Sequence, residues 1–128
     1  MQQLIYIGIA GFFGSISRYL VAGWTSSLSL GRFPFGTMTV NVVGSLLLGF
    51  IFTLSTDRLS IHPDIKLALT VGFLGSFTTF STFSLETFNL FKAGDLYLSL
   101  MNIVMNLFFS IIAVVIGIAA AKLIYGVE

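Results

Sequence analysis

The hydrophobic positions of this chain fall into four long runs that are separated by short polar stretches. The runs cover residues 4–24, 37–55, 65–91 and 97–124. About 20 apolar residues in a helix cross the roughly 30 Å hydrocarbon core of a bilayer, so each run is long enough to span it. The connections "TSSLSLGRFPFG" (25–36), "TDRLSIHPD" (56–64) and "KAGDL" (92–96) carry the Gly, Pro and Asp residues that end helices. The pattern predicts an all-α membrane protein with four transmembrane helices, in a single domain over residues 1–128.

The third run is too long for a simple span. As one helix its 27 residues would extend about 40 Å. Its centre reads "GSFTTFSTFS" (75–84), in which hydroxyl side chains alternate with aromatic rings. Hydroxyls satisfy backbone groups that a broken helix frees, and irregular backbone is tolerated at membrane depth where protein or water covers it. We therefore expect this helix to break near its middle, at Gly75–Thr79, with a continuous kinked helix as the alternative.

The composition indicates whether the folded chain is surrounded by water or by lipid. Hydrophobic residues make up 56% of it, charged residues only 9%, and the mean hydropathy is +1.02. Soluble domains carry about 25% charged residues, so this composition indicates an integral membrane protein. Cysteine is absent, which excludes a disulfide framework and a thiolate metal site. The first run has no basic region before it and no small-residue cleavage site after it, so it reads as a membrane helix and not as a signal peptide.

Lys and Arg are divided almost evenly between the two ends of the predicted bundle. Arg58, Lys66 and Lys122 fall on the side of the N-terminus. Arg32 and Lys92 fall on the opposite side, and Arg18 lies nearer that side within the first span. Orientation in the membrane normally follows the excess of these residues in the loops. With almost no excess, we expect insertion in both orientations and a dimer of oppositely oriented copies. A single orientation fixed by another feature is the alternative.

A few polar side chains lie inside the predicted spans. Arg18 follows the start of the first span by 14 residues, so an aqueous vestibule or a buried partner reaches it, or it extends to the headgroups. Asn41 is either a pore residue or a hydrogen-bonding contact between helices. Asn102, Asn106 and Ser110 recur every four residues and share one helical stripe, which we expect to face protein or water.

The polar groups in these spans suit a small anion that has lost its water. Hydroxyls and amides donate hydrogen bonds without titrating near neutral pH, and aromatic rings have a positive edge. A strongly positive lining would bind an anion too tightly to release it. Phe80 and Phe83, one turn apart among hydroxyl residues, are therefore candidates for a ladder of weak sites. The alternative is that these rings only pack the core.

Three segments closely resemble the Fluc (CrcB) family of bacterial fluoride channels: "GFFGSISRY" (11–19), "FPFGTMTVNVVGSLLLGF" (33–50) and "GFLGSFTTFSTFSLE" (72–86). The resemblance covers essentially the whole chain. It implies a multi-pass channel of the bacterial plasma membrane that passively exports cytoplasmic fluoride and gives fluoride resistance. It also implies an antiparallel, dual-topology homodimer with two pores and a central structural sodium ion. The implied partners are fluoride, membrane lipid and the second copy, with no nucleic acid.

The resemblance further implies roles for individual residues. In the family the Asn of "VN" and the two Phe of "TFSTF" line the pore, and these are Asn41, Phe80 and Phe83 here. Hydroxyl groups form a polar track along the pore, for which the candidates are Thr37, Ser81, Thr82 and Ser110.

Two further features of the family map onto this chain. Arg18 corresponds to the Arg of the aqueous vestibule, and the backbone carbonyls of Gly75 and Thr78 correspond to those that hold the sodium. Ser76 stands where the family often has a second Gly, which bears on the geometry of the break. Neither Asn102 nor Asn106 matches a motif of the family.

Two other classes of function stay open. A proton-coupled exporter similar to the small multidrug resistance proteins would also have four spans and dual topology, but it depends on a carboxylate in the first helix. The first span here has none, and the acid within the spans is Glu86. A non-transporting assembly factor or holin-like protein would leave Asn41 and the two Phe without a purpose. The sequence shows no nucleophile, catalytic base or metal cluster, so we expect no enzyme.

Overall fold

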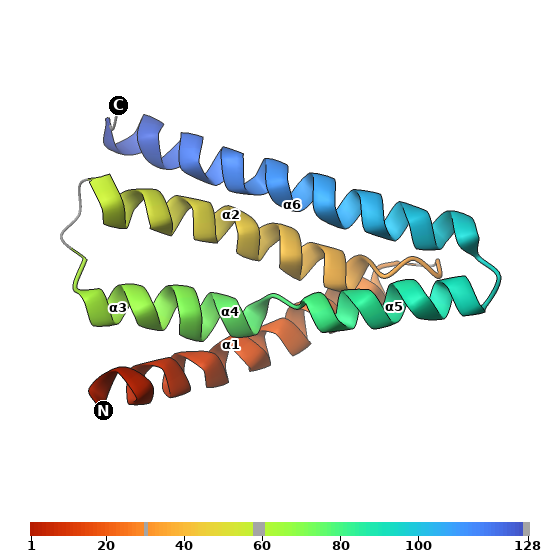
Figure 1. Cartoon of the computed structure of the whole chain (residues 1–128), viewed down its shortest axis with the longest axis horizontal. Helices are drawn as coiled ribbons and strands as arrows, with labels where there is room; N and C mark the ends of the chain where they lie inside the picture. Colours follow the sequence, from red (N-terminus) through yellow and green to blue (C-terminus); the bar gives the residue numbers. More distant parts are fainter. Residues whose placement is uncertain (30, 58–60, 127–128) are drawn as a thin grey trace.

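The computed structural model describes residues 1–29, 31–57 and 61–126, and these residues form antiparallel helical segments without a strand (Figure 1). The helices in chain order are α1 (Gln2–Ser27), α2 (Phe35–Asp57), α3 (Pro63–Leu67), the π-helix η1 (Ala68–Leu74), α4 (Gly75–Phe77), α5 (Phe80–Lys92) and α6 (Leu96–Tyr125). The elements from α3 to α5 follow one another as a single third segment. Both chain ends lie at the same end of the bundle, as an even number of spans requires (Figure 1).

The structure confirms the prediction of four membrane-spanning segments. In the described part of the chain, four helical stretches are long and apolar enough to cross a bilayer: Gln2–Ser27, Phe35–Thr56, Pro63–Lys92 and Leu96–Tyr125. Each predicted run lies inside one of these stretches and is one to three residues shorter at either end. Arg58, which entered the charge comparison, lies outside the described residues.

Local signals in the sequence explain where the segments begin and turn. His62 caps α3, because its Nδ1 accepts a hydrogen bond from the Asp64 N–H at 3.3 Å, and Pro63 follows at the first helical position. The turn between α5 and α6 uses Gly94 with φ of 83°, a backbone conformation that favours glycine. At that same end Arg32 pairs with Asp95, which ties the α1–α2 connection to the α5–α6 connection.

Small residues allow α2 and α6 to pack closely along most of their length. Ala113, Gly117 and Ala121 of α6 are all buried. A Cβ atom on Gly117 would overlap the carbonyl oxygen of Leu46, and one on Gly49 of α2 would overlap the α6 backbone. The stripe of small residues in the sequence is therefore a helix-packing surface, as such stripes are in other membrane proteins.

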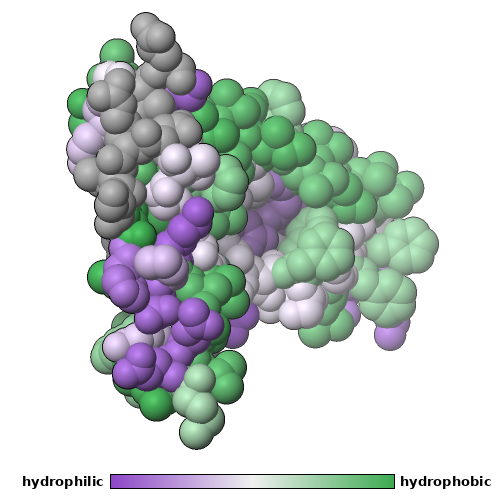
Figure 2. Space-filling model, turned by 60° about the vertical axis from the view of Figure 1, so that its left-hand side comes forward, coloured by the Kyte–Doolittle hydropathy of each residue, from purple (hydrophilic) through white to green (hydrophobic). Residues whose placement is uncertain are grey.

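The helix α1 packs against the first half of the third segment and leaves most of its side chains exposed. It contacts η1 and α4, where a Cβ on Gly72 would lie 2.9 Å from the carbonyl oxygen of Ile7. Figure 2 shows hydrophilic residues gathered near the end that carries the chain termini, with hydrophobic side chains over much of the remaining visible surface. Large exposed apolar side chains such as Phe12 and Trp24 fit a surface that meets lipid or another protein.

Candidate functional site

The third segment breaks at two residues in extended conformation. Thr78 has φ −89° and ψ 159°, and Thr79 has φ −152° and ψ 120°. The break lies within the predicted stretch, and a continuous kinked helix is excluded. Gly75 itself is helical, with φ −62° and ψ −31°, so the hydroxyl residues and not the glycine adopt the irregular backbone. The Thr79 side chain makes this possible, because its Oγ1 accepts the Thr82 N–H at 3.2 Å and caps the new helix α5.

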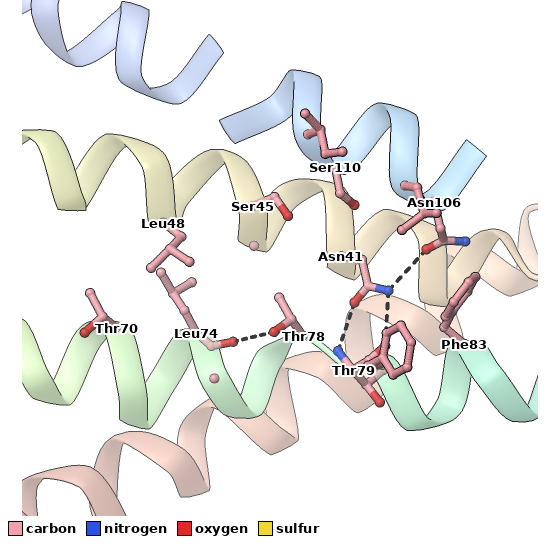
Figure 3. Close-up of a pocket in the computed structure, with 15 residues that line it drawn as sticks. Asn41, Ser45, Leu48, Thr70, Leu74, Thr78, Thr79, Phe83, Asn106 and Ser110 are labelled. Atoms are coloured by element: carbon pink, nitrogen blue, oxygen red, sulfur yellow. Dashed lines mark hydrogen bonds between the residues drawn. The ribbon is translucent and has the colours of Figure 1, made fainter. Parts of the chain in front are cut away.

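Asn41 of α2 hydrogen-bonds both backbone groups of Thr79. The Thr79 N–H donates to Asn41 Oδ1 at 2.9 Å, and Asn41 Nδ2 donates to the Thr79 carbonyl oxygen at 3.2 Å (Figure 3). The amide oxygen thus replaces the helical acceptor that the Thr79 N–H loses at the break, and the amide nitrogen adds a second contact at the Thr79 carbonyl. This matters in a membrane, where an unsatisfied backbone group costs several kcal/mol.

A cavity of about 320 Å³ lies beside this contact, between the break, α2 and α6, and we call it the Asn41 cavity. The predicted pore and sodium-site residues that line it are Asn41, Phe80, Phe83, Ser110, Gly75 and Thr78. Ser45 and Thr70 add hydroxyl groups to the wall, and Leu48 and Leu74 add apolar side chains (Figure 3). The hydroxyls of Ser45 and Ser110 make no hydrogen bond within the described part of the chain. The cavity therefore offers free, non-titrating donors inside an apolar wall.

The two aromatic rings of the Asn41 cavity differ in exposure. Phe83 is 7% exposed and Phe80 is 74% exposed in the single chain. Their ring centroids lie 5.4 Å apart, with an angle of 52° between the planes. Phe83 is thus enclosed by the chain itself, whereas Phe80 presents its ring outward.

A second cavity, of about 350 Å³, contains most of the other predicted residues. Arg18, Thr37 and Thr82 line this Arg18 cavity together with Glu86. Thr79 lines both cavities, so they share the break as a wall. Thr37 donates its hydroxyl hydrogen to Glu86 Oε1 at 2.7 Å. The arrangement combines a guanidinium group, several hydroxyls and a carboxylate in one partly open hollow.

Ser81 is the one predicted pore residue that the structure brings into neither cavity among the described residues. It is exposed in the single chain, and its Oγ lies 3.3 Å from Thr79 Oγ1. Thr79 Oγ1 also donates to Thr82 Oγ1 at 3.0 Å. The three hydroxyls therefore form a cluster at the start of α5, with Thr79 at its centre.

Two backbone carbonyls at the break lose their usual helical partners. In an unbroken helix the Gly75 carbonyl would accept the Thr79 N–H, and the Thr78 carbonyl would accept the Thr82 N–H. Here these N–H groups donate to Asn41 and to Thr79 Oγ1 instead. Carbonyls of unwound membrane helices are typical ligands of Na⁺, so Gly75 and Thr78 have the chemistry that such an ion needs. In the described ranges no group of three or more His, Cys, Asp or Glu residues lies close enough to hold a metal.

Sequence reasoning did not assign a site role to Glu86, Asn102 or Asn106. Glu86 Oε2 is buried without a hydrogen-bond partner in the described part of the chain. Asn102 and Asn106 are buried, and their amides bond to one another and to neighbouring helices. The signal for the two amides was their spacing of four residues, and the prediction that this stripe faces protein or water is confirmed for both. The signal for Glu86 was its position within a membrane span, where a carboxylate is rare.

Comparison with known proteins places these features in a family. Residues 5–118 match the family described as "CrcB-like protein, Camphor Resistance (CrcB)". The protein named fluoride-specific ion channel FluC of Geotalea daltonii is 40% identical over 124 residues, covering 97% of this chain and 100% of the relative. The protein of the same name from Clostridium novyi is 42% identical over 128 residues, covering 98% and 100%. That from Hahella chejuensis is 41% identical over 124 residues, covering 97% and 98%.

The matched ranges extend across all four membrane segments. This chain belongs to the CrcB family.

Proposed function

We propose that this chain is a fluoride-selective passive channel that exports fluoride across the bacterial plasma membrane. The observation that carries the proposal is the identity of about 40%, over nearly the full length, to relatives named fluoride-specific ion channel FluC. A potential that is negative inside drives an anion outward, by about 2.3 kcal/mol per charge for each 100 mV. Export therefore needs only a selective path, and it confers fluoride resistance.

The lining of the Asn41 cavity supports this proposal chemically. A small anion gives up its water only where donors replace it at close range, and the free hydroxyls of Ser45 and Ser110 are such donors. The edges of Phe80 and Phe83 add weak attraction without a full positive charge that would trap the ion. Thr37 and Thr82 line the Arg18 cavity, and Ser81 is joined to Thr82 through the Thr79 hydroxyl. Arg18 attracts anions to this vestibule. A larger anion such as chloride would reach fewer donors at once.

We further propose that two copies assemble as an antiparallel homodimer with two pores. The even division of Lys and Arg between the ends supports dual topology. The exposed ring of Phe80 supports the second copy, because a pore residue must be enclosed. A further apolar hollow of about 540 Å³ between α5 and α6, lined in part by Phe80, Phe88 and Phe91, offers a surface for such contact.

A structural sodium ion at the centre of the dimer completes the proposal. Gly75 and Thr78 would contribute carbonyl oxygens from each copy, since the amides that would normally bond these carbonyls are diverted at the break. The ion would offset the cost of carbonyl groups left without a donor at membrane depth. Replacing Na⁺ by a large organic cation should lower dimer stability in detergent, and an unchanged dimer would argue against the ion.

Efflux of fluoride from liposomes tests the central proposal. Vesicles that hold the purified protein and are loaded with fluoride should release it rapidly once a counter-ion path is opened, whereas chloride-loaded vesicles should retain chloride. Protein-free vesicles with the same counter-ion path are the control. Comparable release of both anions, or no fluoride release above the control, would overturn the function.

A further inference from the structure

A series of hydrogen bonds leaves the break through α2 and enters α6. It begins where the Thr79 N–H donates to Asn41 Oδ1 at 2.9 Å. Asn41 Nδ2 then donates to Asn106 Oδ1 of α6 at 3.2 Å, as Figure 3 shows. Asn106 Nδ2 donates in turn to Asn102 Oδ1, one turn earlier on α6, at 2.8 Å. In each of these three bonds the donor lies nearer the break along the series than the acceptor does.

The series then returns to the third segment. Asn102 Nδ2 donates to Thr87 Oγ1 of α5 at 2.9 Å. The Thr87 hydroxyl donates to the carbonyl oxygen of Phe83 at 2.8 Å. The bonds thus form a loop that starts at the residue capping α5 and ends one turn into the same helix. We call the four side chains of this loop the amide relay: Asn41, Asn106, Asn102 and Thr87.

The orientation of each amide in the relay is fixed by its neighbours. Reversing any one of the three Asn amides would set nitrogen against a donor or oxygen against an acceptor. Asn102 is 0% exposed and Asn106 is 4% exposed, so water does not compensate a broken contact. Hydrogen bonds that run head to tail also strengthen one another in a medium of low dielectric constant. The relay is therefore a defined structural unit with one consistent arrangement.

Neither of the two α6 amides offers a donor to an anion in the two cavities. An Asn side chain carries two amide hydrogens, and Asn106 Nδ2 contacts both the carbonyl oxygen and Oδ1 of Asn102, at 3.2 and 2.8 Å. Asn102 lines neither the Asn41 cavity nor the Arg18 cavity. Asn106 does line the Asn41 cavity, but its nitrogen faces Asn102. These residues therefore affect the fluoride path only by way of their contacts with Asn41 and α5.

We propose that Asn106, Asn102 and Thr87 are positioning residues that hold Asn41 and the first turn of α5 in the geometry needed for fluoride passage. The inference rests on the proposed function, because passage is what the geometry serves. Without Asn106 one Asn41 N–H loses its acceptor, so only the Thr79 backbone still holds the amide and its tie to α6 is lost. Without the Thr87 hydroxyl the Asn102 N–H is buried and unpaired, and the tie from α6 to the Phe83 backbone is lost.

The matched pair Thr87→Val and Thr87→Ser tests this inference. Valine keeps the shape of threonine but removes the hydroxyl, and serine keeps the hydroxyl. Asn89→Leu is the control for removal of a polar side chain, because Asn89 is exposed on α5 and its side chain makes no hydrogen bond within the described residues. Two quantities are measured on each purified variant: deuterium exchange of the Thr79 amide, and fluoride efflux from liposomes.

We expect Thr87→Val to raise the exchange rate of the Thr79 amide by about tenfold, the change that the loss of one hydrogen bond produces. Its fluoride efflux should fall by a similar factor, while Thr87→Ser and Asn89→Leu stay near the parent in both measurements. Parental exchange in Thr87→Val, or equal damage from Thr87→Ser, would overturn the relay. Faster exchange with parental efflux would overturn its role in passage. A parent protein that moves no fluoride would overturn the proposed function alone, because the exchange comparison still decides whether the relay holds the break.

Discussion

Thr37, near the start of α2, donates its hydroxyl hydrogen to Oε1 of Glu86 in α5 across 2.7 Å. The contact lies in the Arg18 cavity, where the second carboxylate oxygen is buried without a hydrogen-bond partner among the described residues. A carboxylate within a membrane span is either a fixed acceptor or a group that exchanges protons during transport. The two roles differ in what happens when the charge is removed.

Glu86→Gln separates these roles. Glutamine keeps a carbonyl oxygen for the Thr37 hydroxyl but has no proton to exchange. We expect fluoride efflux from liposomes to persist in this variant and to be independent of an imposed pH gradient, because a passive path needs no titrating group. Flux that requires a pH gradient in the parent and disappears in Glu86→Gln would favour a proton-coupled exporter.

Two pairs of Phe residues test the ring ladder against simple packing. Phe83 and Phe77 are similarly buried, at 7% and 5% exposure, but of the two Phe83 alone lines the Asn41 cavity. Substitution of either by Ile should cost about 1 kcal/mol of stability, since both positions are packed. Fluoride efflux should fall by about tenfold in Phe83→Ile, which matches a ring-edge attraction of order 1 kcal/mol. It should stay near the parent in Phe77→Ile.

The second pair consists of the exposed rings, Phe80 and Phe88. Phe80→Ile should lower fluoride efflux as Phe83→Ile does. Phe88 lines the apolar hollow between α5 and α6 but not the Asn41 cavity, so Phe88→Ile should keep its efflux when the dimer is intact. Size-exclusion profiles recorded for all four variants show whether assembly is intact. If Phe80→Ile and Phe83→Ile conduct like the parent protein, the rings are packing residues and the ladder is wrong.

Those features of the site that are local in sequence could be predicted from it. The hydroxyl-rich stretch from 75 to 84 indicated the break, and the four-residue spacing on α6 indicated the buried amides. Contacts between distant residues could not be predicted. The bond between Asn41 and Thr79 joins positions 38 residues apart, and that between Thr37 and Glu86 joins positions 49 residues apart. Both depend on how α2 is rotated and shifted against the third segment, which packing decides and periodicity does not reveal.

The close contact of α2 and α6 predicts that Gly117 cannot be replaced by a larger residue without a loss of stability. In Gly117→Ala the new Cβ would overlap the Leu46 carbonyl oxygen, which is backbone and cannot rotate away. We expect a loss of about 1–3 kcal/mol of stability, as for other overpacked sites. Gly23→Ala is the matched control, because a Cβ there meets nothing within 4 Å. Thermal unfolding in detergent should show a lower midpoint for Gly117→Ala only. Equal midpoints would show that α2 and α6 accommodate the added methyl group without a loss of stability.

Dual topology predicts that insertion in the membrane depends on the balance of positive charge between the two ends of the bundle. Arg32 and Lys92 lie at the end opposite the chain termini, where Arg32 is partly offset by its pairing with Asp95. Because neither end has a clear excess of positive charge, reporters fused to the C-terminus should detect both orientations in one cell population. Two or three Lys residues added to the connection at 56–64 should bias insertion to one orientation, whereas the same number of Gln residues should not.

The biased chain alone should then lose fluoride efflux, since an antiparallel dimer needs both orientations. Co-expression with a copy that carries the added Lys in the 25–36 connection should restore it. A chain that inserts in one orientation and keeps full efflux would rule out the antiparallel dimer.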